Sequence, residues 1–225
     1  MIYRFLTTAF RILKKNLGVS LINILGLSLS LAVFLLILQF VSFELSYDTF
    51  HQDKEHIYRV ESQFFKNEEL TDDWATSSTG YGQALLEAFP EITAMTRLYS
   101  WNSERVVQYE DTKFREKQVV AADSAFFTFF SFPFVAGNPE TALQEPNTVV
   151  ISESYRQKYF GNEDPIGKTL KISDIQRTYI CEVTGVFADF PVNSHLHYDI
   201  VYSWATVASH WKNMDTFWYK HSAYT

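Results

Sequence analysis

The feature that most constrains this fold is an uncharged run near the N-terminus. Residues 17–43 read LGVSLINILGLSLSLAVFLLILQFVSF, without a single Asp, Glu, Lys or Arg. A helix needs about 20 apolar residues to cross the hydrocarbon core of a bilayer. The apolar part of a secretory signal peptide is shorter, about 7–15 residues, and ends at a small-residue cleavage site, which we do not find before Glu44. We therefore predict a retained transmembrane helix over residues 17–43, followed by a body over residues 44–225.

Charge is distributed unevenly along the chain. Residues 1–43 hold Arg4, Arg11, Lys14 and Lys15 and no acidic residue, so 15 of the 19 Lys and Arg and all 26 Asp and Glu come later. Basic residues beside a membrane helix stay in the cytoplasm, so we expect a cytoplasmic N-terminus and an extracytoplasmic body. An acidic body without a basic stripe argues against nucleic-acid binding.

Residues 1–16 form a unit of their own. Their apolar residues recur at helical spacing, and the charged residues fall between them: Ile2, Phe5, Leu6, Ala9, Phe10, Ile12 and Leu13. This pattern predicts an amphipathic helix on the cytoplasmic membrane surface. On the residues alone, a lipid anchor is favoured over a docking helix for a cytoplasmic partner.

The body mixes strand and helix patterns without a regular strand–helix–strand rhythm, which is typical of an α+β fold. Alternation that begins at Ile57 and Arg59 predicts a first strand. Further strands are expected within 92–101, 104–111, 114–123, 147–152, 168–173 and 178–189, and helical segments within 80–90, 124–130 and 152–160.

The stretch YFGNEDPIGKTL, residues 159–170, resembles a phosphate-binding loop because Gly167, Lys168 and Thr169 follow Gly161. A phosphate-binding loop has four residues between its first glycine and the Gly-Lys-Thr, whereas this stretch has five. Two acids and a proline, Glu163, Asp164 and Pro165, also stand where an anion would need N–H donors. We predict a turn that ends a helix at Gly161 and starts a strand at Lys168.

Two clusters contain residue types that bind metals. His195, His197 and Asp199 alternate in SHLHYD, and on a strand they would share one face. A polar strand face is the favoured interpretation, because two histidines and one acid are too few to be diagnostic. The segment HQDKEH contains His51, Asp53, Glu55 and His56. We interpret it as a solvated loop rather than a metal site.

Two other features favour packing over chemistry. The segment SAFFTFFSFPF concentrates six phenylalanines, which predict core rather than a ligand-stacking platform: Phe126, Phe127, Phe129, Phe130, Phe132 and Phe134. Cys181, the sole cysteine, is expected to be inert packing in a strand. No hydrolase, metalloprotease, Cys-x-x-Cys or dinucleotide motif occurs. We therefore expect no enzyme activity and no catalytic, cofactor-binding or metal-binding residue.

Five phrases, in this order, resemble the MacB/FtsX-like permease family of ABC transporters, especially its Bacteroidetes-type members. They are AFRILKKNLGVSLINILGLSLSLAVFLLI, ELSYDTFHQDKEHIYRV, ADSAFFTFFSFPFVAGNPETAL, VVISESYRQKYFGNEDPIGKTL and VTGVFADFPVNSHLHYD. The resemblance implies a bacterial inner-membrane subunit with a periplasmic core domain of α+β character. It also implies a separate partner ATPase and a second permease subunit, and it turns residues 1–16 from an anchor into an expected coupling element.

The sequence departs from this family in one respect. Permeases of this family need at least four membrane helices, and no second uncharged run of sufficient length follows Phe43. We therefore expect the chain to be the N-terminal part of a longer permease that couples ATP hydrolysis by its partner to movement of the periplasmic domain. The alternative is a single-span receptor or binding module with an extracytoplasmic sensor domain. The sequence does not indicate the substrate or signal.

Overall fold

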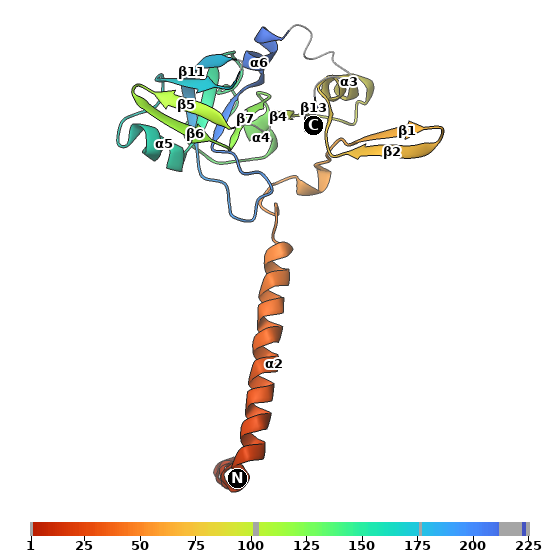
Figure 1. Ribbon diagram of the computed structural model, residues 1–225, viewed down its shortest axis with the longest axis vertical. Helices are drawn as coiled ribbons and strands as arrows, with labels where there is room; N and C mark the ends of the chain where they lie inside the picture. Colours follow the sequence, from red (N-terminus) through yellow and green to blue (C-terminus); the bar gives the residue numbers. More distant parts are fainter. Residues whose placement is uncertain (1, 101–103, 176, 212–221, 224–225) are drawn as a thin grey trace. The chain divides into compact units, whose positions relative to one another are not determined.

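The computed structural model describes residues 2–100, 104–175, 177–211 and 222–223 (Figure 1). The chain separates into two units, residues 1–47 and residues 48–225, and each is described by itself. The first unit consists of two helices, α1 (Ile2–Lys15) and α2 (Leu17–Glu44), with Asn16 between them.

Helix α2 is apolar on all sides. It has no buried residue, and its large side chains are exposed, for example Leu27 at 73%. A helix that is hydrophobic around its whole circumference needs an apolar environment, which here the protein does not provide. Among the described helices, α2 is long and apolar enough to cross a membrane.

Helix α1 is amphipathic in composition. It has no acid in its first turn and ends with Lys14 and Lys15, a distribution that complements the helix dipole. The Nζ atom of Lys14 lies 5.8 Å from the centre of the Phe10 ring, and both side chains are exposed.

The second unit is a mixed α/β body. Its strands are β1 (Ser62–Lys66), β2 (Glu69–Trp74), β3 (Ser77–Ser78), β4 (Leu98–Tyr99), β5 (Arg105–Tyr109), β6 (Thr112–Glu116), β7 (Val119–Ala122), β8 (Phe134–Gly137), β9 (Thr148–Ser152), β10 (Thr169–Ser173), β11 (Thr178–Phe187), β12 (Ile200–Ser203) and β13 (Ser222–Ala223). Its helices are η1 (Lys54–His56), α3 (Tyr81–Ala88), α4 (Phe126–Phe129), α5 (Glu153–Phe160) and α6 (Trp204–His210).

The main sheet has nine strands in the order β4-β7-β12-β9-β11-β10-β5-β6, and β8 pairs with β11 outside this path. The pairs β7–β12 and β9–β11 are parallel, and the other pairs are antiparallel. Gly137 of β8 pairs with Gly185 of β11, next to the register shift between Val183 and Gly185 in the pairing with β9. Gly137 has φ 87°, and a Cβ atom there would collide with the Thr184 carbonyl.

Hydrophobic clusters cover both faces of the sheet centre. Val149 and Ile151 of β9 belong to one cluster, which includes residues of α5 and α6, whereas Val150 between them belongs to the other, which includes Phe126 and Phe127 of α4. Adjacent residues of a strand point to opposite faces, so a strand buried on both faces is continuously apolar. All five residues of β9 are buried accordingly.

The expected α+β class is confirmed, and several of its elements differ from the expectation. The strand expected within 114–123 is two strands, β6 and β7, which end and begin on either side of Lys117 and Gln118. In the described part of the 92–101 segment, residues 92–100, only Leu98–Tyr99 pairs as a strand, and the first strand begins at Ser62 rather than at Ile57. The patterning also missed β8 and β12, because strands of four residues carry little periodicity, and β2, because its residues are all exposed and show no apolar alternation.

Candidate functional site

The SHLHYD segment is a loop and not a strand, so His195, His197 and Asp199 do not form a polar strand face. His195 pairs with Asp48, while the Asp199 carboxylate accepts a hydrogen bond from the Ser152 hydroxyl at 3.2 Å. His197 is exposed. The sequence grouped these three residues by their spacing. In the structure, however, His195 and Asp199 bond to different partners, Asp48 and Ser152.

The HQDKEH segment is only partly solvated. Residues 52–56 are exposed, but His51 is 6% exposed, so the interpretation as a solvated loop is wrong for this residue. Its Nδ1 atom lies 2.5 Å from the Phe130 carbonyl oxygen, which can only accept, so Nδ1 carries the proton. Among the residues that the structure describes, no group of three or more His, Cys, Asp and Glu side chains could hold a metal ion.

The GNEDPIGKTL segment is a turn, as predicted. Helix α5 starts at an N-cap where the Ser152 hydroxyl accepts a hydrogen bond from the Tyr155 N–H, and it ends at Gly161 with φ 59°. Strand β10 begins at Thr169. The ammonium group of Lys168 pairs with the Glu163 carboxylate, so an acid inside the same loop holds the cation that would otherwise face a phosphate.

Most of the phenylalanine cluster is core, as predicted, with Phe130 and Phe134 partly buried against the fully buried members. Phe126, Phe127 and Phe132 are at most 4% exposed, and Phe126 and Phe127 pack edge to face with ring centres 4.9 Å apart. Cys181 is fully buried in β11, and burial raises the pKa of its thiol to about 12. A thiol in this environment is unreactive, which confirms that Cys181 acts as packing.

One polar contact holds the first residue of the body to a loop far along the chain. The Asp48 N–H donates to the Asn193 carbonyl at 3.0 Å, and the Asp48 carboxylate accepts from the His195 N–H at 3.0 Å. The His195 Nδ1 atom lies 2.6 Å from the other carboxylate oxygen. We call these three residues the Asp48 clip.

The backbone and the ionisation of Asp48 both fit this role. Asp48 has φ 52°, a left-handed conformation that Asp tolerates better than most residues. Partial burial raises its pKa, but hydrogen bonds from His195 and the charge of that ring outweigh burial, so the pKa lies below its ordinary value. The clip therefore favours the ionised carboxylate.

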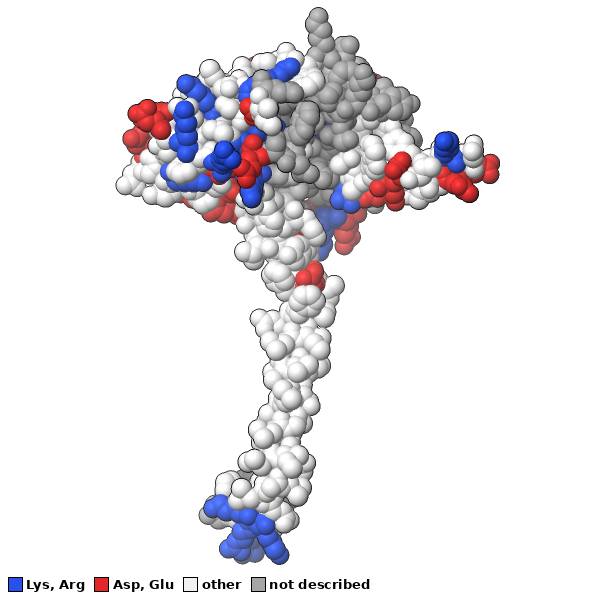
Figure 2. Space-filling model, viewed as in Figure 1, with Lys and Arg blue, Asp and Glu red and all other residues white. Residues whose placement is uncertain are grey.

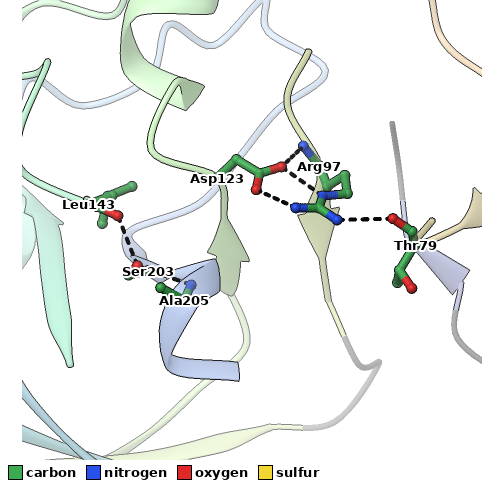
Figure 3. A network of polar contacts seen from close by, with 6 residues as sticks. All are labelled: Thr79, Arg97, Asp123, Leu143, Ser203 and Ala205. Carbon is green, nitrogen blue, oxygen red and sulfur yellow. Dashed lines mark hydrogen bonds and ion pairs between the residues drawn. The ribbon is translucent and has the colours of Figure 1, made fainter. Parts of the chain in front are cut away.

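A second polar node joins short segments to the sheet (Figure 3). The guanidinium of Arg97 forms two hydrogen bonds with the Asp123 carboxylate, at 2.9 and 2.8 Å, and donates to the Thr79 carbonyl at 3.0 Å. It also lies 4.2 Å from the Trp204 ring. Arg97 is 5% exposed, so the ion pair is buried and carries a desolvation cost. Hydrogen bonds from the Arg97 guanidinium to the Thr79 carbonyl and from the Arg97 N–H to the Asp123 carboxylate offset this cost.

A third node attaches α5 to β6. The Glu116 carboxylate is 3% exposed and accepts from the hydroxyls of Tyr155 and Tyr159 at 2.8 and 2.6 Å, and from the Lys158 ammonium at 2.7 Å. Burial, followed by the hydrogen bond to Glu116, raises the pKa of both tyrosines above their ordinary value, so they stay protonated donors. Three donors reach this buried carboxylate, so each of its two oxygens accepts at least one hydrogen bond.

These nodes were missed by sequence reasoning. Asp48 and His195 are 147 positions apart, and Arg97 and Asp123 are 26 apart, so no local pattern links them. A charged residue beside buried strand residues, such as Glu116 before VVAA, is the one signal that could have indicated a buried partner. Within the described residues, these arrangements position and hold segments of the body, and none combines a nucleophile with a base.

The chain matches the family model described as MacB-like periplasmic core domain over residues 20–221. No curated protein matches the sequence. A domain of a protein described as a permease from Porphyromonas gingivalis is 26% identical, with TM-score 0.56 over 68% of this chain and 69% of that one.

Two further solved structures show weaker likeness. The periplasmic region of MacB from Actinobacillus actinomycetemcomitans is 18% identical, with TM-score 0.49 over 66% of this chain and 64% of that one. The extracellular domain of the ABC-type transporter YknZ from Gram-positive bacteria is 16% identical, with TM-score 0.47 over 75% of this chain and 83% of that one. This chain therefore spans less than two thirds of the MacB periplasmic region.

Proposed function

The chain belongs to the family of MacB-like periplasmic core domains, and from this premise we propose that it is part of an ABC transporter permease subunit in a bacterial inner membrane. The single observation that carries the proposal is the family match, which covers most of α2 and most of the body. In this role α2 crosses the bilayer, residues 1–16 stay in the cytoplasm and the body is periplasmic.

The proposed function needs ATP hydrolysis by another chain. The phosphate-loop-like segment of this chain is a turn whose lysine is already paired with an acid, so we assign ATP binding to a partner ATPase. Helix α1 carries exposed cations and the exposed Phe10, which suit a contact with such a partner. The permease works as a pair of copies or with a related second subunit.

Movement reaches the body through the residues that follow α2. The chain leaves this helix at Glu44, and Asp48 is already bonded to the loop that contains Asn193 and His195. A pull on this segment is therefore passed to a loop that leads directly into β12, a central strand of the sheet. We assign the coupling of ATP hydrolysis to export, extraction or signalling to this path.

Co-purification tests the proposal. The full gene product, tagged and extracted from native membranes in mild detergent, is expected to retain an ATPase and to function only with ATP. The Phe10→Ala/Arg11→Ala variant should lower recovery of the ATPase, while Lys54→Ala, in the body, should not. ATP-independent function together with no associated ATPase would exclude the permease role.

A single-span receptor is the second candidate, and it is favoured by one observation: the described residues contain one membrane-length helix. The two functions predict different sequence downstream of Thr225 in the gene. Three or more further apolar spans support the permease, and a kinase or signalling domain supports the receptor.

A further inference from the structure

The outer face of β5, β6, β10 and β11 is solvent-exposed. Val107 of β5, Ile172 of β10 and Tyr179 of β11 point into the core. Adjacent residues of a strand point to opposite faces, so the neighbours of these residues along each strand point outward. The pairing places four outward residues in one row across the strands: Lys113 opposite Gln108, Gln108 opposite Lys171, and Lys171 opposite Ile180.

This face is basic although the body is acidic. It carries Lys113, Arg115 and Lys171, with Lys117 just beyond β6, and we call this group the basic face. Arg115 and Lys117 share one acid, Glu104, at 3.7 and 3.6 Å. Within the part of the chain that the structure describes, no carboxylate pairs with Lys113 or Lys171. Lys and Arg side chains gather over β5 and β6 in Figure 2.

The basic face also has an apolar component. Ile180 is 57% exposed and Val106 is 38% exposed, and both lie among the cations on the same side of the sheet. Glu182 of β11 is the acid on the strands of this face. A surface with cations around exposed aliphatic side chains fits a partner that is acidic and apolar at once.

The β1–β2 hairpin has the complementary character. Among the strands that the structure describes, its two strands pair only with each other, and every residue of β2 is exposed. It carries four acids against one lysine, Lys66: Glu68, Glu69, Asp72 and Asp73. It also exposes three large apolar side chains at 48–62%: Phe65, Leu70 and Trp74. A two-stranded hairpin with this much exposed apolar surface is marginal in water and gains stability by docking.

We propose that the β1–β2 hairpin of one copy docks on the basic face of a second copy. Charge complementarity carries this assignment, because two acidic bodies repel unless each meets a locally basic surface. Two copies anchored in one membrane meet at high effective concentration, so a modest contact suffices. The inference rests on the proposed function in one respect, the pairing of two permease copies.

Charge reversal and its rescue test this contact. Full-length chains with two different tags are co-inserted in vesicles, and recovery of one tag with the other is measured. Asp72→Lys/Asp73→Lys places one lysine on each face of the hairpin, so it covers either docking face. This variant alone, or Lys113→Glu/Lys171→Glu alone, should lower association about tenfold or more, because attraction becomes repulsion.

Mixing the two reversed variants should restore association to within about threefold, and restoration also shows that both variants fold. Glu91→Lys/Glu145→Lys is the matched control for the hairpin variant: it changes net charge by the same amount, outside the hairpin, and should leave association unchanged. Unchanged association in both reversed variants, or no rescue on mixing, overturns the contact. ATPase co-purification with the unaltered chain then still reports on the proposed function independently.

Discussion

Helix α2 and strand β9 contain the same kinds of side chain in opposite surroundings. Leu27 of α2 is 73% exposed, whereas Val149, Val150 and Ile151 of β9 are fully buried between two clusters. With 28 residues, α2 is about 42 Å long, enough for a bilayer core of about 30 Å. The difference shows that an apolar segment needs an apolar environment, and that the length of the segment indicates whether lipid, as for α2, or protein, as for β9, provides it.

The largest effect should come from truncating a side chain that the protein itself buries. Phe127→Ala removes a ring that is 1% exposed and packs on Phe134 and Phe187, so the free energy of unfolding should fall by about 3–5 kcal/mol. Urea denaturation of the full chain in detergent measures it. Leu36→Ala, at a position 65% exposed in α2, should leave the body unfolding transition where it was.

A charged residue introduced into α2 tests whether lipid or protein surrounds this helix. Leu31→Arg should disfavour membrane insertion by about 2.5–3.5 kcal/mol, because an arginine at the helix centre faces hydrocarbon. The fraction of chain recovered in carbonate-washed membranes measures this change. Ile175→Arg, at a site 95% exposed in the body, is the control. Equal insertion of both variants would contradict a lipid-facing α2.

Polar groups in the body should show a smaller contrast of the same kind. Glu116→Gln weakens three hydrogen bonds to a buried carboxylate and should cost about 1.5–3 kcal/mol of unfolding free energy. Glu163→Gln removes an acid that is 65% exposed, so about 0–1 kcal/mol is expected. If thermal unfolding ranks the two variants in the opposite order, the Glu116 node does not hold α5.

The smallest effect concerns pH. The folded-state pKa of Asp48 lies below its unfolded value of 3.8, so its contribution is present above about pH 4 and is lost as pH falls through the lowered folded pKa. The side chain is 34% exposed, so we expect less than about 1 kcal/mol. The difference in Tm between the unaltered chain and Asp48→Asn should shrink between pH 6 and pH 3. A difference independent of pH would mean that the ionised carboxylate contributes nothing.

How much could be predicted from the sequence depends on how local each feature is. The α2 run, the helix over 152–160 with its Gly161 end, and the α+β class rest on neighbouring residues, and the structure has them. Short strands such as β12 lack enough residues for a period to show. The expectation of residues 17–43 as a domain of its own stays a prediction.

Features made by distant residues escaped the sequence. The Asp48 clip joins positions 147 apart, and the basic face combines side chains from β6 and β10, whose sequence neighbours include acids. The sequence contains no basic stripe because the cations align only across paired strands. The grouping of His195 with His197 failed for a related reason, because spacing in the sequence gives order along the chain and not position in space.

Helix α1 and the body are proposed to lie on opposite sides of the membrane, and thiol labelling of intact spheroplasts tests this most directly. The native Cys181 is buried with its pKa raised to about 12, so it stays silent. Ile175→Cys should react with a membrane-impermeant maleimide in intact spheroplasts, and Thr8→Cys only after lysis. Labelling of Thr8→Cys from outside, with Ile175→Cys protected until lysis, would contradict a cytoplasmic α1 and a periplasmic body.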